Sequence, residues 1–580
     1  MKVKFIIIVI LILMVGCNKV ANTQMTNPNS KGRYENVKKY MRSYIKEQMK
    51  DNDITGLSIA LTDGKKIVWQ EGFGYANKDK GIKATPQTIY RAGSITKLFT
   101  DMSVMKLAEL GKIDIDKPFK KYLPEFKIKS RFGSTDNITP RNIMTHHSAI
   151  PSDWLEGVFT SNPMPFTNYV KVIKNEYVTN KPNTVFSYSN LAITLLGHSV
   201  QRVSGIKYAK FVEQNFLKPM DMNNSNINAA IVGNNISKSY KKGKEVIEYA
   251  NSMVPAGGLN TSVKELSHFA IMLNSNGKYK NHQLLKPRTI KKMFRVQNTN
   301  VALDVGNKIG LGFAIDDTTL GRDNRIYCHG GAMVAHRAYF GVSPRTKLGV
   351  VVMANSANAN PLKIGEELFK KAYEAKTGKK PSKKRLVVNY NSNFEGIYST
   401  IIGAIKIEKS GNDSYNVKSN KGEFKLYKTN RNSYKLKYKL FGFLPISNSK
   451  LDELELYTKD INGYHIIIAS FPDIDILAGV KVDKPTNIPT KWKEYLGEYK
   501  PINNLEAEDF KIDYVELKIK DGYLVADVNF KLGELDTTLI LKAINDTEVI
   551  IEGLGRNRGN TLYFKGGIFH AMGLKLVKVQ

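Results

Sequence analysis

Residues 91–110, RAGSITKLFTDMSVMKLAEL, predict a helix that begins beside a serine and a lysine. Gly111 follows the last apolar residue and marks a helix stop. Ser94 therefore lies at the N-terminus of the predicted helix, and Lys97 lies one turn later on the same face. The apolar residues that recur at helical spacing are Ile95, Leu98, Phe99, Met102, Met105 and Leu110.

This pair can perform nucleophilic chemistry. A serine hydroxyl attacks well only when a base takes its proton, and a lysine amine is such a base once burial or nearby cations keep it neutral. The helix N-terminus adds N–H groups where an oxyanion would form. The alternative is that Ser94 only caps the helix and Lys97 is a solvated charge. The Ser-x-x-Lys pattern alone cannot decide, because it also starts at Ser43, Ser103, Ser204, Ser239, Ser275 and Ser447.

Two further motifs follow along the chain. Tyr188-Ser189-Asn190 begins a second amphipathic helix, and His329-Gly330-Gly331 lies in a predicted strand. The segments GKIDIDKPFKKYLPEF, ITPRNIMTHHSAIP, VPAGGLNTSVKELSHFA and GVSPRTKLGVVVMAN accompany them. With these motifs in this order, residues 38–375 resemble the family of class C β-lactamases, D-alanyl-D-alanine carboxypeptidases, D-aminopeptidases and related esterases.

The resemblance assigns roles to the first two motifs. It implies that Ser94 is the acylated nucleophile and that Lys97 accepts its proton. It implies that Tyr188 shares the proton relay, as an acid toward the leaving group and a base toward the deacylating water. It implies that Asn190 hydrogen-bonds the substrate amide and Lys97.

The third motif departs from the β-lactamase pattern. His329 stands where true β-lactamases have lysine, and Gly330 where they have threonine, while Gly331 keeps the motif's glycine. The resemblance implies an oxyanion hole built by the backbone N–H groups of Ser94 and Ala332. Within the family, His-x-Gly accompanies esterases and D-amino-acid peptidases more than lactamases. Loss of a permanent cation puts antibiotic hydrolysis in doubt.

The order of elements predicts an α/β (α+β) sandwich of the β-lactamase/transpeptidase type. Residues 34–50 read as an amphipathic helix, two strands surround a turn at Asp63, helices dominate to about residue 300, and strands and a helix close the region. We expect an antiparallel sheet flanked by helices, with a helical subdomain, over residues 34–378. Residues 379–390 read as a basic linker.

Residues 391–580 predict an all-β region without helices. Short strands alternate with Gly, Asn and Asp turns. The similar segments FEGIY at 394–398 and YLGEY at 495–499 leave open whether the region holds two repeats, 391–484 and 491–580. This region could bind the cell wall, cover the active site or act as a spacer.

The N-terminus predicts export. Two lysines precede an apolar run over residues 5–16, too short for a bilayer span, and the LMVGC ending resembles a bacterial lipobox. We expect a signal peptide at 1–16 and a lipidated tether at 17–33 that starts at Cys17, with an uncleaved anchor or a non-lipidated secreted chain as alternatives. Cys328 is the only other cysteine, so a lipidated Cys17 leaves no intramolecular disulfide.

Charge is unevenly distributed along the 580 residues, whose formal net charge is +34. Residues 1–390 hold 60 Lys and Arg against 28 Asp and Glu, whereas residues 391–580 hold 27 against 25. Anionic lipid head groups or an anionic wall polymer are therefore possible partners, with biased composition as the alternative. Nucleic acid is not expected, since the chain is exported and shows no compact basic-aromatic motif.

The expected function is that of a lipid-anchored hydrolase on the extracytoplasmic face of the cell membrane. It would act through an acyl-enzyme on D-amino-acid peptides, amides or esters of the cell envelope. The alternatives are a β-lactamase, a D-alanyl-D-alanine carboxypeptidase, or a weakly catalytic penicillin-binding or sensing protein. No cofactor is expected, because the sequence shows neither a metal-ligand cluster nor a glycine-rich phosphate loop.

Overall fold

The computed structural model describes most of the chain after the N-terminal segment. The predicted signal peptide 1–16, Cys17, nearly all of the tether and most of the linker lie outside the described residues. Within the described part, no helix has the length and apolar character required to cross a bilayer. The described residues are 32–381, 393–429, 433–440, 444–446, 454–471, 474–485, 487–532 and 535–579.

A seven-stranded antiparallel sheet forms the centre of residues 34–378, which we call the first region. Its order, β13-β14-β15-β16-β1-β2-β3, places the first strands of the chain beside the last strands of the region. The predicted antiparallel sheet with flanking helices is confirmed. The strands are β1 (Gly56–Asp63), β2 (Lys66–Asn77), β3 (Ile82–Lys83), β13 (Ala314–Asp316), β14 (Ile326–Ala332), β15 (Arg337–Ser343) and β16 (Leu348–Ala354).

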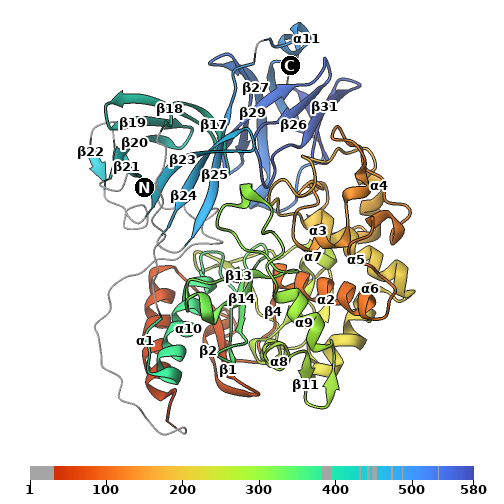
Figure 1. Cartoon of the computed structure of the whole chain (residues 1–580), viewed down its shortest axis with the longest axis vertical. Helices are drawn as coiled ribbons and strands as arrows, with labels where there is room; N and C mark the ends of the chain where they lie inside the picture. The colour runs from red at the N-terminus through yellow and green to blue at the C-terminus, as the bar shows by residue number, and fades with distance from the viewer. Residues whose placement is uncertain are drawn as a thin grey trace.

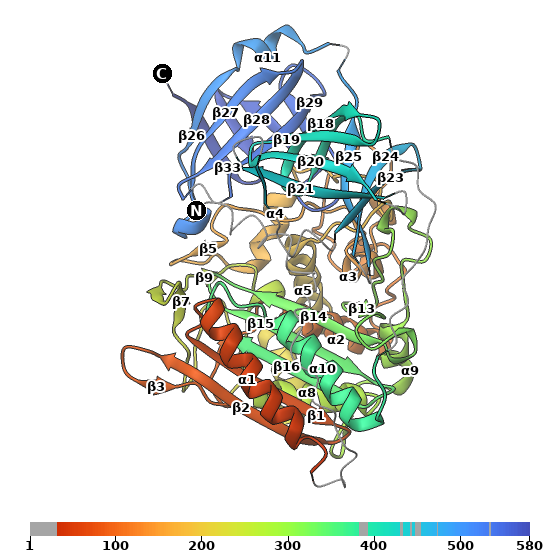
Figure 2. The ribbon, with the colours of Figure 1, turned by 90° about the vertical axis from the view of Figure 1, so that its left-hand side faces the viewer.

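Helices cover both faces of this sheet (Figure 2). Alternate residues of a strand point to opposite faces, so Ile59 and Val352 pack against helices α1 (Glu35–Asp51) and α10 (Pro361–Thr377). Their neighbours Ala60 and Val351 belong to the core on the other side, beneath α8 (Val263–Asn274). All seven residues of β16 are buried, which explains the continuous apolar run LGVVVMA.

The helical subdomain lies to one side of the sheet (Figure 1). Its two longest helices are α2 (Thr96–Glu109), which a 3-10 turn at Gly93–Ile95 precedes, and α5 (Asn190–Ser204). The shorter helices are α3 (Pro140–Met144), α4 (Tyr169–Ile173), α6 (Tyr208–Val212), α7 (Val254–Gly257) and α9 (Pro287–Phe294). The short strands are β4 (Tyr90–Arg91), β5 (Phe159–Thr160), β6 (Asn226–Ile227), β7 (Ser239–Lys241), β8 (Lys244–Val246), β9 (Ala250–Asn251), β10 (Leu259–Thr261), β11 (Lys278–Tyr279) and β12 (His282–Gln283).

Two antiparallel β-barrels follow the first region. In the first barrel, a β20–β21 pairing joins the ends of the strand order β20-β19-β18-β17-β25-β24-β23-β21, and β22 pairs with β21. Its strands are β17 (Gly396–Thr400), β18 (Gly403–Gly411), β19 (Ser414–Ser419), β20 (Gly422–Lys428), β21 (Tyr434–Leu440), β22 (Leu444–Ile446), β23 (Glu455–Ile461), β24 (Tyr464–Ser470) and β25 (Asp475–Val482).

The second barrel is closed by eight strands. The predicted all-β region is confirmed, with one short α-helix in addition among its described residues: α11 (Thr490–Glu494) precedes this barrel and buries Trp492 in its core. A helix of five residues is too short to show a periodic pattern in the sequence. The strands are β26 (Gly497–Pro501), β27 (Ile512–Lys520), β28 (Tyr523–Phe530), β29 (Thr537–Ala543), β30 (Glu548–Ile551), β31 (Thr561–Lys565), β32 (Ile568–Ala571) and β33 (Leu574–Lys578).

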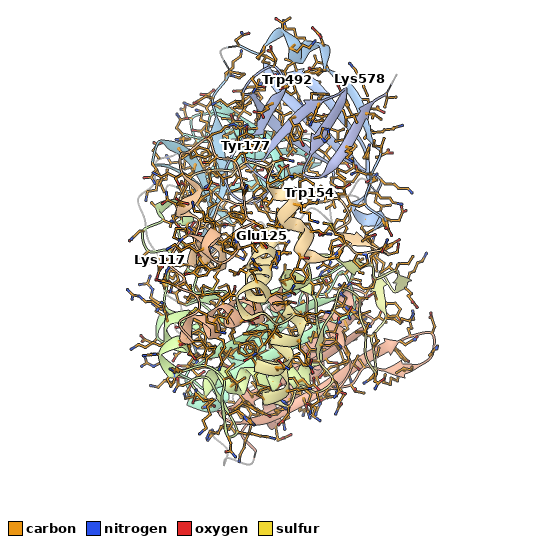
Figure 3. All side chains as sticks on the ribbon, turned by 90° about the vertical axis from the view of Figure 1, so that its right-hand side faces the viewer. Lys117, Glu125, Trp154, Tyr177, Trp492 and Lys578 are labelled. Atoms are coloured by element: carbon orange, nitrogen blue, oxygen red, sulfur yellow. The ribbon has the colours of Figure 1, made fainter. Side chains whose placement is uncertain are left out.

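The second barrel rests on the first region (Figures 1 and 3). Trp154 and Tyr177 lie near the edge of the barrel in Figure 3. The indole of Trp154 packs against Gly573, and the guanidinium of Arg131 lies 3.5 Å from the centroid of the Tyr177 ring. The same guanidinium forms a 2.8 Å ion pair with Glu548 at the start of β30. Aromatic and ionic contacts thus join the barrel to the first region.

Candidate functional site

Ser94 and Lys97 meet at the start of α2. Lys97 Nζ donates to Ser94 Oγ at 3.0 Å and to the carbonyl oxygen of Ala256 at 2.8 Å. The side chain is not a solvated charge, since only 1% of Lys97 is exposed. Burial first, and the positive charge of Arg556 second, lower the pKa of Lys97 to about 7. A substantial fraction of this amine is therefore neutral at neutral pH and able to take the proton of Ser94.

Tyr188 lies beside this pair, two residues before the start of α5. Its ring centroid is 4.9 Å from Lys97 Nζ. Burial raises the pKa of Tyr188 above the ordinary range, against a smaller opposing effect of the nearby Ser94 hydroxyl. The phenol therefore stays protonated at neutral pH and can donate a proton, whereas the partly neutral amine of Lys97 can accept one.

Asn190 begins α5 and faces a carboxylate. Its Nδ2 donates to Asp153 Oδ1 at 2.6 Å. The resemblance implied a hydrogen bond from Asn190 to Lys97, but the hydrogen bonds of Lys97 among the described residues run to Ser94 and Ala256. Asn190 is thus held beside the site by Asp153, a residue that no motif in the sequence indicated.

The third motif forms the end of β14, directly against the serine turn. A Cβ at Gly331 would lie 2.0 Å from the carbonyl oxygen of Ala92, so only glycine permits this approach. The backbone of Ala332, the next residue, packs against Gly93. Backbone groups of Ala332 and of the Ser94 turn are thereby brought together, as the predicted oxyanion hole requires.

His329 contributes a neutral ring to the site. Its Nδ1 hydrogen-bonds the carbonyl oxygen of Gly330 at 2.6 Å, and its ring centroid is 6.3 Å from that of Tyr188. Burial, followed by the charge of Lys97, lowers the pKa of His329 to about 4. The imidazole is therefore uncharged at pH 7 and does not replace the cation that lysine supplies in a Lys-Thr-Gly motif.

Two adjacent histidines, His146 and His147, hold the segment around Tyr188 in place. The ring of His146 packs at a tilt against the Tyr188 ring, with centroids 4.3 Å apart, and its Nδ1 accepts from the N–H of Ser189 at 3.2 Å. His147 Nε2 lies 2.8 Å from Asp304 Oδ2, and the other oxygen of Asp304 accepts from the N–H of Phe186 at 2.7 Å. These contacts fix the chain on both sides of Tyr188.

Arg556 enters the site from the second barrel. Its Nη2 lies 2.9 Å from Asp153 Oδ2, and its guanidinium carbon lies 5.3 Å from the centroid of the Tyr188 ring. Sequence reasoning missed this residue, because it lies in a region expected to contribute only strands. The one available signal was the segment GLGRNRG at 553–559, a glycine-rich loop with two arginines.

Asp101 lies one helical turn beyond Lys97, fully buried. Neither carboxylate oxygen has a hydrogen-bond partner among the described residues. Burial raises the pKa of Asp101 well above its ordinary value, against a smaller opposing effect of Lys97. A protonated, uncharged Asp101 is the form that this environment favours.

Comparisons with known proteins agree with this geometry. Residues 41–372 match the family model described as Beta-lactamase. The chain is 27% identical over 334 residues to "Protein flp" of Staphylococcus aureus (strain N315), a match that covers 56% of this chain and 64% of that protein. The chain thus spans less than two thirds of the length of this relative.

Solved structures share the fold. The octameric penicillin-binding protein homologue from Pyrococcus abyssi aligns with a TM-score of 0.52 and 24% identity, over 76% of this chain and 99% of that one. EstCE1, a hydrolase with promiscuous acyltransferase activity, aligns with a TM-score of 0.52 and 16% identity, over 58% of this chain and 99% of its own. At these identities the likeness is one of fold.

Proposed function

The chain belongs to the Beta-lactamase family, and from this premise we propose that it is a serine hydrolase that forms an acyl-enzyme on Ser94. One observation carries the proposal: the buried amine of Lys97 lies 3.0 Å from Ser94 Oγ. A base with a pKa near the working pH serves proton transfer best, and that of Lys97 is lowered to about 7.

The reaction follows from the positions of these groups. Ser94 Oγ attacks the substrate carbonyl as Lys97 Nζ takes its proton. The backbone N–H groups of Ser94 and Ala332 stabilise the oxyanion, and the Tyr188 hydroxyl passes a proton to the leaving group. Water then attacks the acyl-enzyme, with its proton returning along the same relay, and Ser94 is regenerated.

We propose D-amino-acid peptides, amides or esters of the cell envelope as substrates. His329 is neutral and stands at the position where β-lactamases carry a lysine, so the cation of that motif is missing from this position. This substitution supports the proposed class over β-lactams. Three alternatives remain: a β-lactamase, a carboxypeptidase and a slowly deacylating sensor. They differ from the proposed hydrolase in the acyl group that is transferred to Ser94 and in the lifetime of the acyl-enzyme.

Intact-protein mass spectrometry with a fluorophosphonate probe tests the nucleophile. Ser94→Ala should abolish labelling and lower turnover by several orders of magnitude while the protein stays folded. Ser103→Ala is the matched control, because Ser103 starts another Ser-x-x-Lys quartet on the same helix, and its hydroxyl donates to the carbonyl oxygen of Phe99. Labelling of the Ser94 variant at the wild-type rate would refute the mechanism.

The same measurement separates the substrates. The wild-type protein is incubated with a penicillin, a D-alanyl dipeptide and a D-alanyl ester, and adduct mass is followed with time. Short-lived acyl adducts from the dipeptide or the ester support the proposed class. Rapid penicillin turnover would instead identify a β-lactamase, and a penicillin adduct that persists would identify a sensor.

We further propose that Cys17 carries a lipid anchor on the extracytoplasmic face of the membrane. Support comes from the lipobox-like LMVGC sequence, in a segment outside the described residues. Two or more acyl chains on one residue hold a protein firmly on a bilayer. Cys17→Ala should therefore release the protein from the membrane fraction or leave it unprocessed, and a fully soluble wild-type protein would contradict the anchor.

A further inference from the structure

The loop between β30 and β31 leaves the second barrel and presses against the first region. The N–H of Asn557 donates to Ser152 Oγ at 3.1 Å. At Gly559, with φ of +76°, a Cβ would lie 2.2 Å from the carbonyl oxygen of Thr179. Ser152 and Thr179 belong to the two segments that carry the active-site supports, one after His147 and the other before Tyr188. The loop is thus seated in the wall of the site.

Arg556, at the middle of this loop, reaches the reacting groups. Both Nε and Nη2 contact the same oxygen of Asp153, at 3.3 and 2.9 Å. The other oxygen of Asp153 accepts from Asn190. The side chain of Asp153 is only 14% exposed, whereas that of Arg556 is 46% exposed. One edge of the guanidinium is therefore held in place by Asp153, while nearly half of the Arg556 side chain remains exposed.

Arg556 is the permanent cation among the charged groups described at this site. His329 is neutral at pH 7, and Lys97 is buried and engaged with Ser94. Arg556 therefore places a permanent positive charge beside Tyr188. Because Asp153 already offsets part of that charge, a singly charged planar carboxylate fits it better than a doubly charged phosphate would.

We propose that Arg556 binds a carboxylate of the substrate, so that the active site is shared between the first region and the second barrel. This inference rests on the proposed function and narrows its substrate class. Acyl compounds that end in a free carboxylate, such as peptides with a free C-terminal D-amino acid, are bound in preference to esters or amides without one.

Protection from labelling tests the proposal without requiring turnover. The full-length protein reacts with a fluorophosphonate probe in the presence of N-acetyl-D-alanyl-D-alanine or its C-terminal amide. We expect the acid to protect Ser94 at a concentration at least about tenfold lower than the amide, the discrimination of a charge-assisted hydrogen bond. Arg556→Gln should reduce this ratio to about one, and Arg556→Lys should restore part of it.

Arg131→Gln is the matched control. Arg131, in the first region, pairs with Glu548 of the second barrel. This ion pair joins the same two parts of the chain as Arg556 and Asp153 do, but it does not involve the proposed catalytic groups. This variant should keep the wild-type ratio, which separates loss of the carboxylate contact from loosened docking of the barrel. Circular dichroism and thermal melts establish that each variant is folded.

The possible results distinguish failure of the carboxylate proposal from failure of the proposed function. Equal protection by acid and amide in the wild type, or an unchanged ratio in Arg556→Gln, would overturn the carboxylate proposal while leaving the serine hydrolase intact. A ratio lost equally in Arg131→Gln would also overturn it, because docking alone would then be responsible. Absence of Ser94 labelling in the wild type would instead refute the proposed function itself.

Discussion

Lys97 should set the acidic limb of the pH–rate profile. The amine works as a base only when deprotonated, so activity should rise as the pH passes the pKa of about 7. Burial and then the charge of Arg556 lower its pKa, and the carboxylate of Asp153 opposes them; Asp101 would add to this opposition only in its ionised form. His146 and His329 also lie close enough to feel Lys97, but both have lowered pKa values and are neutral at pH 7.

Removing the positive charge of Arg556 should therefore move the acidic limb to higher pH. With less repulsion in its charged form, Lys97 holds its proton more tightly in Arg556→Gln. Rates of fluorophosphonate labelling between pH 5 and 9 measure the limb directly. Arg131→Gln serves again as the control and should leave it in place. A limb that stays fixed in Arg556→Gln would show that the two groups do not interact.

Asp101 should make the protein less stable as the pH rises. A buried carboxyl whose pKa is raised binds a proton that the unfolded chain releases above about 3.8. Its contribution is thus most favourable below that pH and is lost as the pH increases. Asp101→Asn removes this dependence and should raise the melting temperature at pH 8 more than at pH 5. An equal change at both pH values would mean that Asp101 is ionised in the folded protein.

At the level of elements, a buried hydrogen bond between His147 and Asp304 positions the segment that leads into α5. His147 and Asp304 are both about 2% exposed, and Asp304 also accepts from the backbone of Phe186, two residues before Tyr188. Removing Asp304 leaves buried hydrogen-bond donors of His147 and Phe186 without an acceptor, which costs about 1 to 3 kcal/mol for each buried group. Asp304→Ala should lower the free energy of unfolding by that order and slow the labelling of Ser94.

Asp323 offers the matched comparison for this pair. It is 85% exposed and contacts Arg345 at 3.9 Å, so Asp323→Asn should change the free energy of unfolding by less than about 0.5 kcal/mol. Urea unfolding curves measure both variants. If Asp304→Ala were as mild as Asp323→Asn, the hydrogen bonds of Asp304 would not position Tyr188.

The helix α2 is buried on more sides than its sequence pattern predicts. Its sequence predicts one apolar face, but the structure also buries the polar residues Thr96, Thr100 and Ser103. The helix packs against α5, α6 and α7, and its Phe99 packs against Phe269 of α8. It therefore has no solvent face along most of its length. Buried hydroxyls are satisfied locally, as where Thr100 Oγ1 donates to the carbonyl of Pro255 at 2.7 Å.

For the whole molecule, the uneven charge predicts salt-dependent attachment. The excess of 32 positive charges over residues 1–390 should bind an anionic wall polymer, and added salt should weaken that binding as the Debye length falls from about 10 Å to about 3 Å. Co-sedimentation of the full chain with isolated polymer at increasing salt measures this. Binding that ignores salt would show that the charge is a matter of composition alone.

The sequence by itself determined the parts of this protein that depend on near neighbours. Hydrophobic periodicity placed the helix after Ser94, and one helical turn joined that serine to Lys97. Ordered motifs added Tyr188 and His329 through their resemblance to a family, and strand alternation indicated an all-β region after residue 391.

Only the tertiary structure decided which distant residues meet. Arg556 lies 462 positions after Ser94, and nothing in its own neighbourhood requires it to contact Asp153. That contact depends on how two barrels close and on where the second one docks, and both are set by long-range packing that leaves no periodic trace in the sequence. The same holds for His147 and Asp304, whose pairing joins segments 157 residues apart. The chemistry of the nucleophile is therefore local, whereas the wall that surrounds the substrate is built by the whole fold.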